Sequence, residues 1–81
     1  MTLDQLPRDT QATISAIDWT PLDMREARRL RELGFEEGAG VSIEHKGVLF
    51  WADPIAVRIG RMTVAIRRAH AAQMQVELAA A

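Results

Sequence analysis

The chain has 81 residues, a net charge of −1 and 48% hydrophobic residues, enough for one modest core and too little charge to attract nucleic acid or an anionic membrane. It has no cysteine, which excludes disulfides and thiolate-bound zinc and favours a reducing, cytoplasmic setting. The longest apolar run, Val48–Ala52, is far shorter than the roughly 20 residues of a membrane-spanning helix. We therefore expect a single soluble domain over residues 1–81, with its core at about 3–78.

The N-terminal part predicts a turn and then a strand. Leu6–Thr10 places a proline before short polar residues, a pattern typical of turns. The segment 13–18 is rich in β-branched residues, which favours a first strand there.

An amphipathic helix is predicted next. Thr20 can cap its N-terminus, and Pro21 suits its first turn. Apolar residues recur at helical spacing at Ala27, Leu30 and Leu33, while charged residues occupy the other faces. The glycine that follows Leu33 is the usual C-terminal cap, so we expect the helix to end near this leucine.

The rest of the chain alternates apolar and polar residues with a period of two, as half-buried strands do. This pattern predicts strands at 41–45, 55–59, 62–67 and 74–78. Gly60-Arg61 is a tight link between two of them, and the alanine-rich stretch 68–73 predicts one or two helical turns before the last strand. About five short strands can bury one face only by curling, so we expect a mainly β fold, a small barrel with the amphipathic helix between its first two strands.

Nothing in the sequence predicts a catalytic, cofactor or metal site. The only histidines, His45 and His70, fall on different predicted elements, and a metal site needs more ligands than these two supply. The acidic pair Glu36-Glu37 lies in a predicted turn, where a solvated loop is the simpler interpretation. The glycines at 34, 38 and 40 lack the lysine and hydroxyl residue of a phosphate-binding loop.

The most unusual segment is the apolar run Gly47–Pro54, which we predict to be a loop between two strands. Loops are seldom so apolar. Its aromatic residues either fold back over the barrel mouth or are presented as an anchor for a partner protein. The candidate partner-binding residues here are Val48, Leu49, Phe50 and Trp51.

Arginine is the one enriched charge type. On the helix it is interleaved with glutamate, so a solvated face is the simplest interpretation. The functional alternative is an electrostatic rim around a protein-binding surface, with Arg28, Arg29 and Arg67 as candidates.

An ordered set of short motifs resembles the FeoA family from about Leu3 to Val76. Two departures are Asp9, which stands where a turn glycine is expected, and the apolar character of residues 48–52. The motifs are Leu3-x-x-Leu6-Pro7, Ile14 and Ile17, Arg29-Leu30-x-x-Leu33-Gly34-Phe35, Gly38 and Val41, Asp53-Pro54, Val64-Ala65-Ile66-Arg67, and Ala71-x-x-Met74-x-Val76.

The resemblance implies an SH3-like barrel and a cytosolic accessory protein of bacterial ferrous-iron uptake, which acts on the membrane GTPase transporter FeoB and catalyses nothing itself. It implies no small-molecule substrate and no insertion into the membrane. Arg29 and Arg67 are the motif residues whose charge could serve a partner. The other motif residues are expected to be architectural: Leu30, Leu33, Gly34, Gly38, Asp53 and Pro54.

Two other functions stay open. The same barrel occurs as the C-terminal domain of metal-dependent repressors, so a stand-alone regulatory module is one alternative. A nucleic-acid binder is the other, although such a domain usually presents aromatic residues on a basic face, and here acids balance the arginines. The oligomeric state, a homo-oligomer included, is also open.

Overall fold

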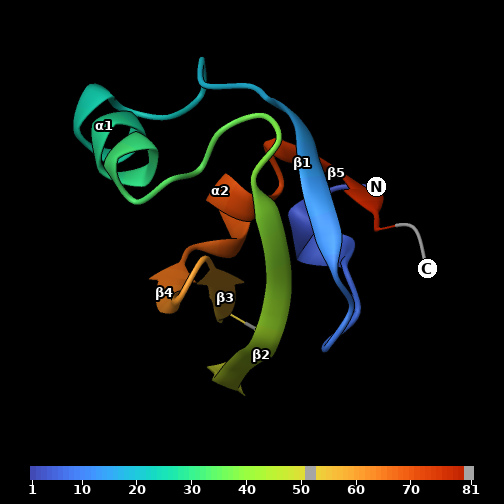
Figure 1. Cartoon of the computed structure of the whole chain (residues 1–81). Helices are drawn as coiled ribbons and strands as arrows, with labels where there is room; N and C mark the ends of the chain where they lie inside the picture. Colours follow the sequence, from blue (N-terminus) through green and yellow to red (C-terminus); the bar gives the residue numbers. More distant parts are fainter. Residues whose placement is uncertain (51–52, 80–81) are drawn as a thin grey trace.

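The computed structural model describes the backbone of residues 1–50 and 53–79 and the side chains of residues 1–45 and 53–79 (Figure 1). The described part contains a short 3-10 helix, two α-helices and five β-strands. In chain order these are η1 (Leu3–Gln5), β1 (Ala12–Ile17), α1 (Met24–Glu32), β2 (Gly40–Phe50), β3 (Asp53–Ile59), β4 (Met62–Ile66), α2 (Arg68–Ala71) and β5 (Met74–Leu78).

The strands form one antiparallel sheet in the order β4-β3-β2-β1-β5. The long strand β2 joins its two halves: it pairs with β3 along most of its length and with β1 only at Ala12↔Val41 and Thr13↔Gly40. The pairing of β1 with β5 is longer and shifts register between Ile14 and Ala16. The mainly β fold, with one helix between β1 and β2 and a short helix before β5, is confirmed (Figure 1).

The core lies on one face of the curled sheet, because alternate residues of the strands point to the same side. Helix α1 adds Ala27 and Leu30 to it, and Leu33 packs against its margin. The N-terminal segment adds Leu3 and Leu6, which are both fully buried. The remaining core residues are Ala12, Ile14, Phe35, Val41, Ile43, Ile55, Val57, Ile59, Val64, Ile66, Ala71, Met74 and Val76.

Helix α1 begins later than the sequence pattern predicts. Its N-cap is Asp23, whose carboxylate accepts a hydrogen bond of 2.8 Å from the Glu26 backbone N–H. Thr20 is not the cap; its hydroxyl donates instead to Asp18 Oδ1, at 2.6 Å. A carboxylate at the N-cap satisfies an amide that has no partner in the helix and also faces the positive end of the helix dipole, which explains the later start.

The predicted apolar loop is wrong for residues 47–50, because these residues continue strand β2. The expected strand 41–45 extends to Phe50, which pairs with Asp53 of β3. The stretch is paired with β3 at its two ends, Lys46↔Ile55 and Phe50↔Asp53, with a register shift between them. Aromatic and branched residues suit a strand. Trp51, the last residue of the predicted anchor, lies outside the described residues.

The turn residues have the backbone conformations that their types favour. Gly34 and Gly38, at the end of α1 and in the loop to β2, have φ angles of 105° and 90°. Asp9, which replaces the expected turn glycine, has φ 58°. This left-handed region is open to glycine and accessible to aspartate, so these turns before β1 and after α1 are encoded locally.

Candidate functional site

The two outer strands of the sheet differ in what covers their free edges. On β5, the Val76 N–H donates to the Met1 carbonyl at 2.8 Å, and Thr2 forms an antiparallel bridge with Gln75. Met1 and Thr2 therefore act as a further, irregular strand, and η1 follows them. On β4 no backbone segment within residues 1–50 and 53–79 pairs with the outer edge.

Helix α1 stands beside β4 and is held there by one arginine. Arg29 Nη2 donates to the Ala65 carbonyl at 3.3 Å, and Arg29 Nη1 forms an ion pair of 2.8 Å with Glu26. Just after the helix, Gly34 lies close to the sheet: a Cβ at this position would be 3.7 Å from Ile59 Cδ1 of β3. Arg29, predicted to serve a partner, thus also has a structural contact within its own chain.

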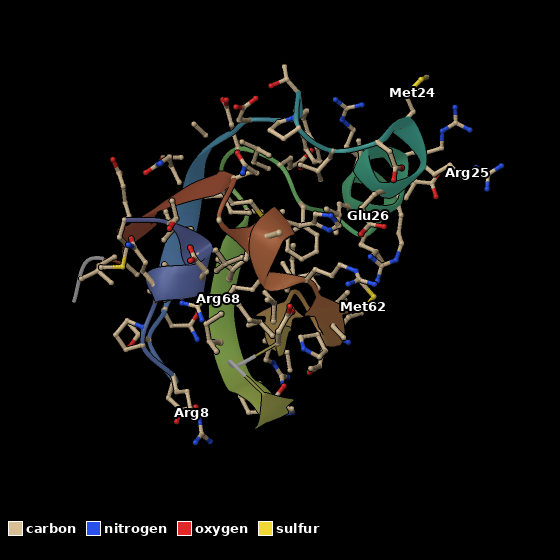
Figure 2. The ribbon with its side chains drawn as sticks, turned by 180° about the vertical axis from the view of Figure 1, so that it is seen from behind. Arg8, Met24, Arg25, Glu26, Met62 and Arg68 are labelled. Carbon is tan, nitrogen blue, oxygen red and sulfur yellow. The ribbon has the colours of Figure 1, made fainter. Side chains whose placement is uncertain are left out.

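A groove lies between the helix and this strand. It has a volume of about 650 Å³ and is lined by Arg29, Glu32, Leu33 and residues 62–65. Met62 is 44% exposed at the groove, and Met24 at the start of α1 is 83% exposed. Figure 2 shows Met24 and Arg25 on α1 pointing away from the molecule and Met62 on the same side of it.

The arginines of α1 are not equivalent. Arg31 lies over the Trp19 ring, with Cζ 4.5 Å from the ring centroid, so it packs on the chain itself. Arg25 and Arg28 make no ion pair with any carboxylate in the described part of the chain. With Met24, Arg29 and Glu32 they line a second hollow, of about 350 Å³, on the outer face of the helix.

Arg67 has different surroundings from the arginines of α1. It is the N-cap residue of α2 and lines a small hollow with Asp53, Pro54 and Ile66. Asp53 Oδ1 accepts a hydrogen bond of 2.9 Å from the Arg68 backbone N–H at the start of α2. Asp53 and Pro54 do begin β3 as expected, but the cap that Asp53 supplies to α2 was not predicted, because it joins residues 15 positions apart.

His70 makes a contact with α1 that the sequence did not reveal. Its Nδ1 lies 3.5 Å from Glu26 Oε1, the same oxygen that pairs with Arg29. This Nδ1 is buried and has no hydrogen bond that meets normal geometry. Within the described residues, no group of three histidine, aspartate or glutamate side chains is placed to hold a metal ion. His45 is exposed on β2.

The predicted anchor residues Val48, Leu49 and Phe50 lie on the far half of β2, and their side chains and Trp51 fall outside what the structure describes. Among the described residues, no helix is long and apolar enough to cross a bilayer. The candidate partner-binding set is therefore divided between the end of β2, helix α1 and the start of α2.

The fold defines a small SH3-like β domain whose open features are a sheet edge and an arginine-bearing helix. The chain matches the FeoA domain over residues 1–78, and it belongs to the FeoA family. A comparison with curated proteins gave no match.

Solved structures of FeoA proteins share the fold. The FeoA of Stenotrophomonas maltophilia is 35% identical, with a TM-score of 0.78 over 95% of this chain and 89% of that one. It was solved with zinc and is described as a prokaryotic SH3 domain protein and a candidate activating factor of ferrous iron transport.

Two structures determined in solution are also similar. The FeoA protein of Chlorobium tepidum is 28% identical, with a TM-score of 0.84 over 99% of this chain and 71% of that one. Iron(II) transport protein A of Clostridium thermocellum is 26% identical, with a TM-score of 0.82 over 96% of this chain. This chain spans 45% of the length of that one.

Proposed function

We propose that this protein is a cytoplasmic accessory factor of bacterial ferrous-iron uptake that acts as a single domain and binds the transporter FeoB. The observation that carries the proposal is the family match over residues 1–78. The S. maltophilia structure, described as a candidate activating factor of ferrous iron transport, supports the same function. The protein acts by binding, as a regulator of the transporter, and has no catalytic step of its own.

The surface features are consistent with binding a protein. Among the described residues there are an unpaired sheet edge, exposed methionines and two helix arginines, Arg25 and Arg28, without an ion pair. A partner protein can pair, bury and neutralise such groups. Catalysis would need a nucleophile, base or metal cluster, and the described residues do not assemble a metal cluster.

The test is capture of the transporter. FeoB from the same organism, solubilised in detergent, is passed over the immobilised chain, and uptake of ferrous iron is measured in cells that lack the chain. We expect FeoB to be retained, and uptake to fall in these cells and return with the gene. Normal uptake in the deletion strain together with no retention of FeoB would contradict the proposal.

Phe50, the last residue of β2, and Trp51, the next residue in the sequence, remain part of the proposal. If Phe50 and Trp51 anchor FeoB, Trp51→Ala should weaken binding by roughly 2 kcal/mol or more with little change in melting temperature. If they cover the core instead, the melting temperature should fall and binding should change only in proportion. Phe50→Ala measured beside it shows whether the two aromatics act together.

A further inference from the structure

We propose that the open edge of β4 and the groove beside α1 bind an extended, acidic segment of the partner protein, which adds to the sheet as a further strand. The assignment of this segment to FeoB rests on the proposed function; the chemistry of the site does not. Sheet edges bind extended peptides through main-chain hydrogen bonds, while neighbouring side chains select the sequence.

The backbone of β4 presents unused hydrogen-bonding groups. In an antiparallel strand, residues alternate between those that bond the neighbouring strand and those whose N–H and C=O point away from it. The Ala65 carbonyl is reached by Arg29 from outside the sheet, so Ala65 is of the second kind, and by alternation so is Thr63. Within the described residues, the N–H groups of Ala65 and Thr63 and the Thr63 carbonyl have no partner on this edge.

This edge also lacks the features that normally prevent pairing. Proteins protect their edges with charged residues, proline or a bulge. Strand β4, Met62–Ile66, contains no charge and no proline, and its register with β3 is unbroken. Helix α1 stands beside the edge across the groove, and among the described residues the group that bonds its outward backbone is the Arg29 guanidinium. An incoming N–H can replace this 3.3 Å bond to the Ala65 carbonyl.

The charge beside the edge selects an acidic segment. Arg29 reaches the edge of β4. Arg25 and Arg28, which have no ion pair within the described chain, line the neighbouring hollow of α1, which shares Arg29 and Glu32 with the groove. Three arginines therefore face one carboxylate, that of Glu32, in the lining of the two hollows. Carboxylates on the added strand would pair with these arginines, and apolar side chains on its other face would cover Met62 and Leu33 at the groove.

A second copy of this chain is a poorer occupant. Pairing through β4 would bring in Met-Thr-Val-Ala-Ile, which carries no carboxylate to meet the arginines. An anionic membrane could attract the arginines but would leave the unpaired N–H groups of β4 without partners. An extended acidic segment satisfies both the charges and the backbone.

The experiment uses two fluorescent peptides long enough to span β4, one of alternating valine and glutamate and one of alternating valine and lysine. Binding is measured by anisotropy, and the site by amide chemical shifts of the labelled protein. We expect the glutamate peptide to bind at least about tenfold more tightly. Its largest shifts should fall on Thr63, Ala65 and the arginines of α1.

Protein variants separate the backbone contribution from the charge contribution. Ala65→Pro removes an outward N–H, which an edge strand tolerates, and should abolish binding of the glutamate peptide without unfolding the protein. Arg28→Ala should weaken this binding roughly threefold. Arg8→Ala, the matched control, removes an arginine on the opposite side of the molecule (Figure 2) together with its hydrogen bond to the Glu44 carbonyl. It should leave the affinity for the glutamate peptide unchanged. Circular dichroism verifies that each variant is folded.

Several results would overturn the proposal: equal binding of the lysine peptide, shifts confined to other strands, or full peptide binding by folded Ala65→Pro. Self-association of the protein that Ala65→Pro abolishes would assign the edge to a second copy. Binding to vesicles of anionic lipid without peptide binding would assign the arginines to a membrane.

If FeoB is retained equally by wild type, by Ala65→Pro and by Arg28→Ala, the proposed function stands and the proposed binding site at β4 is wrong. If the peptide binds but FeoB does not, the site stands and its assignment to FeoB fails.

Discussion

Strands β5 and β4 form the two edges of one sheet, and they differ in whether another part of the chain pairs with them. At β5 the chain returns its own N-terminus, with Leu3 buried and Val76 bonded to Met1. At β4 the described chain provides one arginine side chain and a groove. Since unpaired edges invite association, a fold that closes one edge and leaves the other open has a side available for a partner. The contrast between the two edges is the observation on which the proposed binding site at β4 rests.

The largest expected effect concerns the helix that forms the wall of the open edge. Leu30 is fully buried, so Leu30→Asp places an unpaired charge in the core at a cost of several kcal/mol, comparable with the whole stability of a small domain. We expect this variant to be unfolded by circular dichroism. Arg31→Ala is the control on the same helix and should lose only its contact with Trp19, about 0.5–1 kcal/mol. Similar melting temperatures for both variants would show that α1 does not pack as described.

The next prediction compares the two edges directly. Leu3→Ala removes a fully buried side chain from the covering segment and should cost about 2–5 kcal/mol in urea denaturation. Met62→Ala removes an exposed side chain at the open edge and should change stability by about 0.5 kcal/mol or less. If the two variants lose equal stability, the open edge is covered in solution.

Neighbouring proline substitutions sharpen the description of β4. Val64 pairs with Val57, and by alternation its N–H points to β3. Val64→Pro should therefore cost about 1–3 kcal/mol, because it removes a ladder hydrogen bond and leaves the acceptor on β3 without a partner. Ala65→Pro should cost much less, because its N–H faces outward. Thermal denaturation of the two variants checks the order, and the reverse order would place the Ala65 N–H inside the sheet.

The smallest effect lies in the loop from β1 to α1, away from the open edge. The hydroxyl of Thr20, and then its backbone N–H, hold the pKa of the Asp18 carboxyl below its usual value. A lowered pKa in the folded state stabilises the protein above the ordinary carboxyl pKa, and this contribution is lost as the pH falls through the folded-state pKa. Thr20→Val should raise the Asp18 pKa part of the way back, as read from an NMR titration. An unchanged pKa would mean that the hydroxyl contributes nothing.

The sequence determined most of the elements because their signals are local. Alternation predicted strands at 55–59 and 62–67, since successive side chains of a strand point to opposite faces of the sheet. The observed strands are Asp53–Ile59 and Met62–Ile66. Gly34 and Gly38 marked the end of α1 and the turn after it, because their positive φ angles suit glycine best. The buried face of α1 followed in the same way from the spacing of Ala27 and Leu30.

The tertiary structure decided what depends on residues distant in sequence. The end of β2 was predicted as a loop, yet pairing with β3 carries the strand to Phe50, because the ladder of the neighbouring strand determines where pairing stops. The 3-10 helix η1 was not predicted, because its position depends on contacts with residues distant in sequence. Thr2, just before η1, pairs with Gln75 of β5. The arginines, with Arg28, Arg29 and Arg67 as the candidates, were visible in the sequence, but which arginines pack on the chain itself was not. Arg31 lies on Trp19 and Arg29 reaches Ala65, contacts that only three-dimensional packing could make, whereas Arg25 and Arg28 line a hollow on α1 without an ion pair in the described chain.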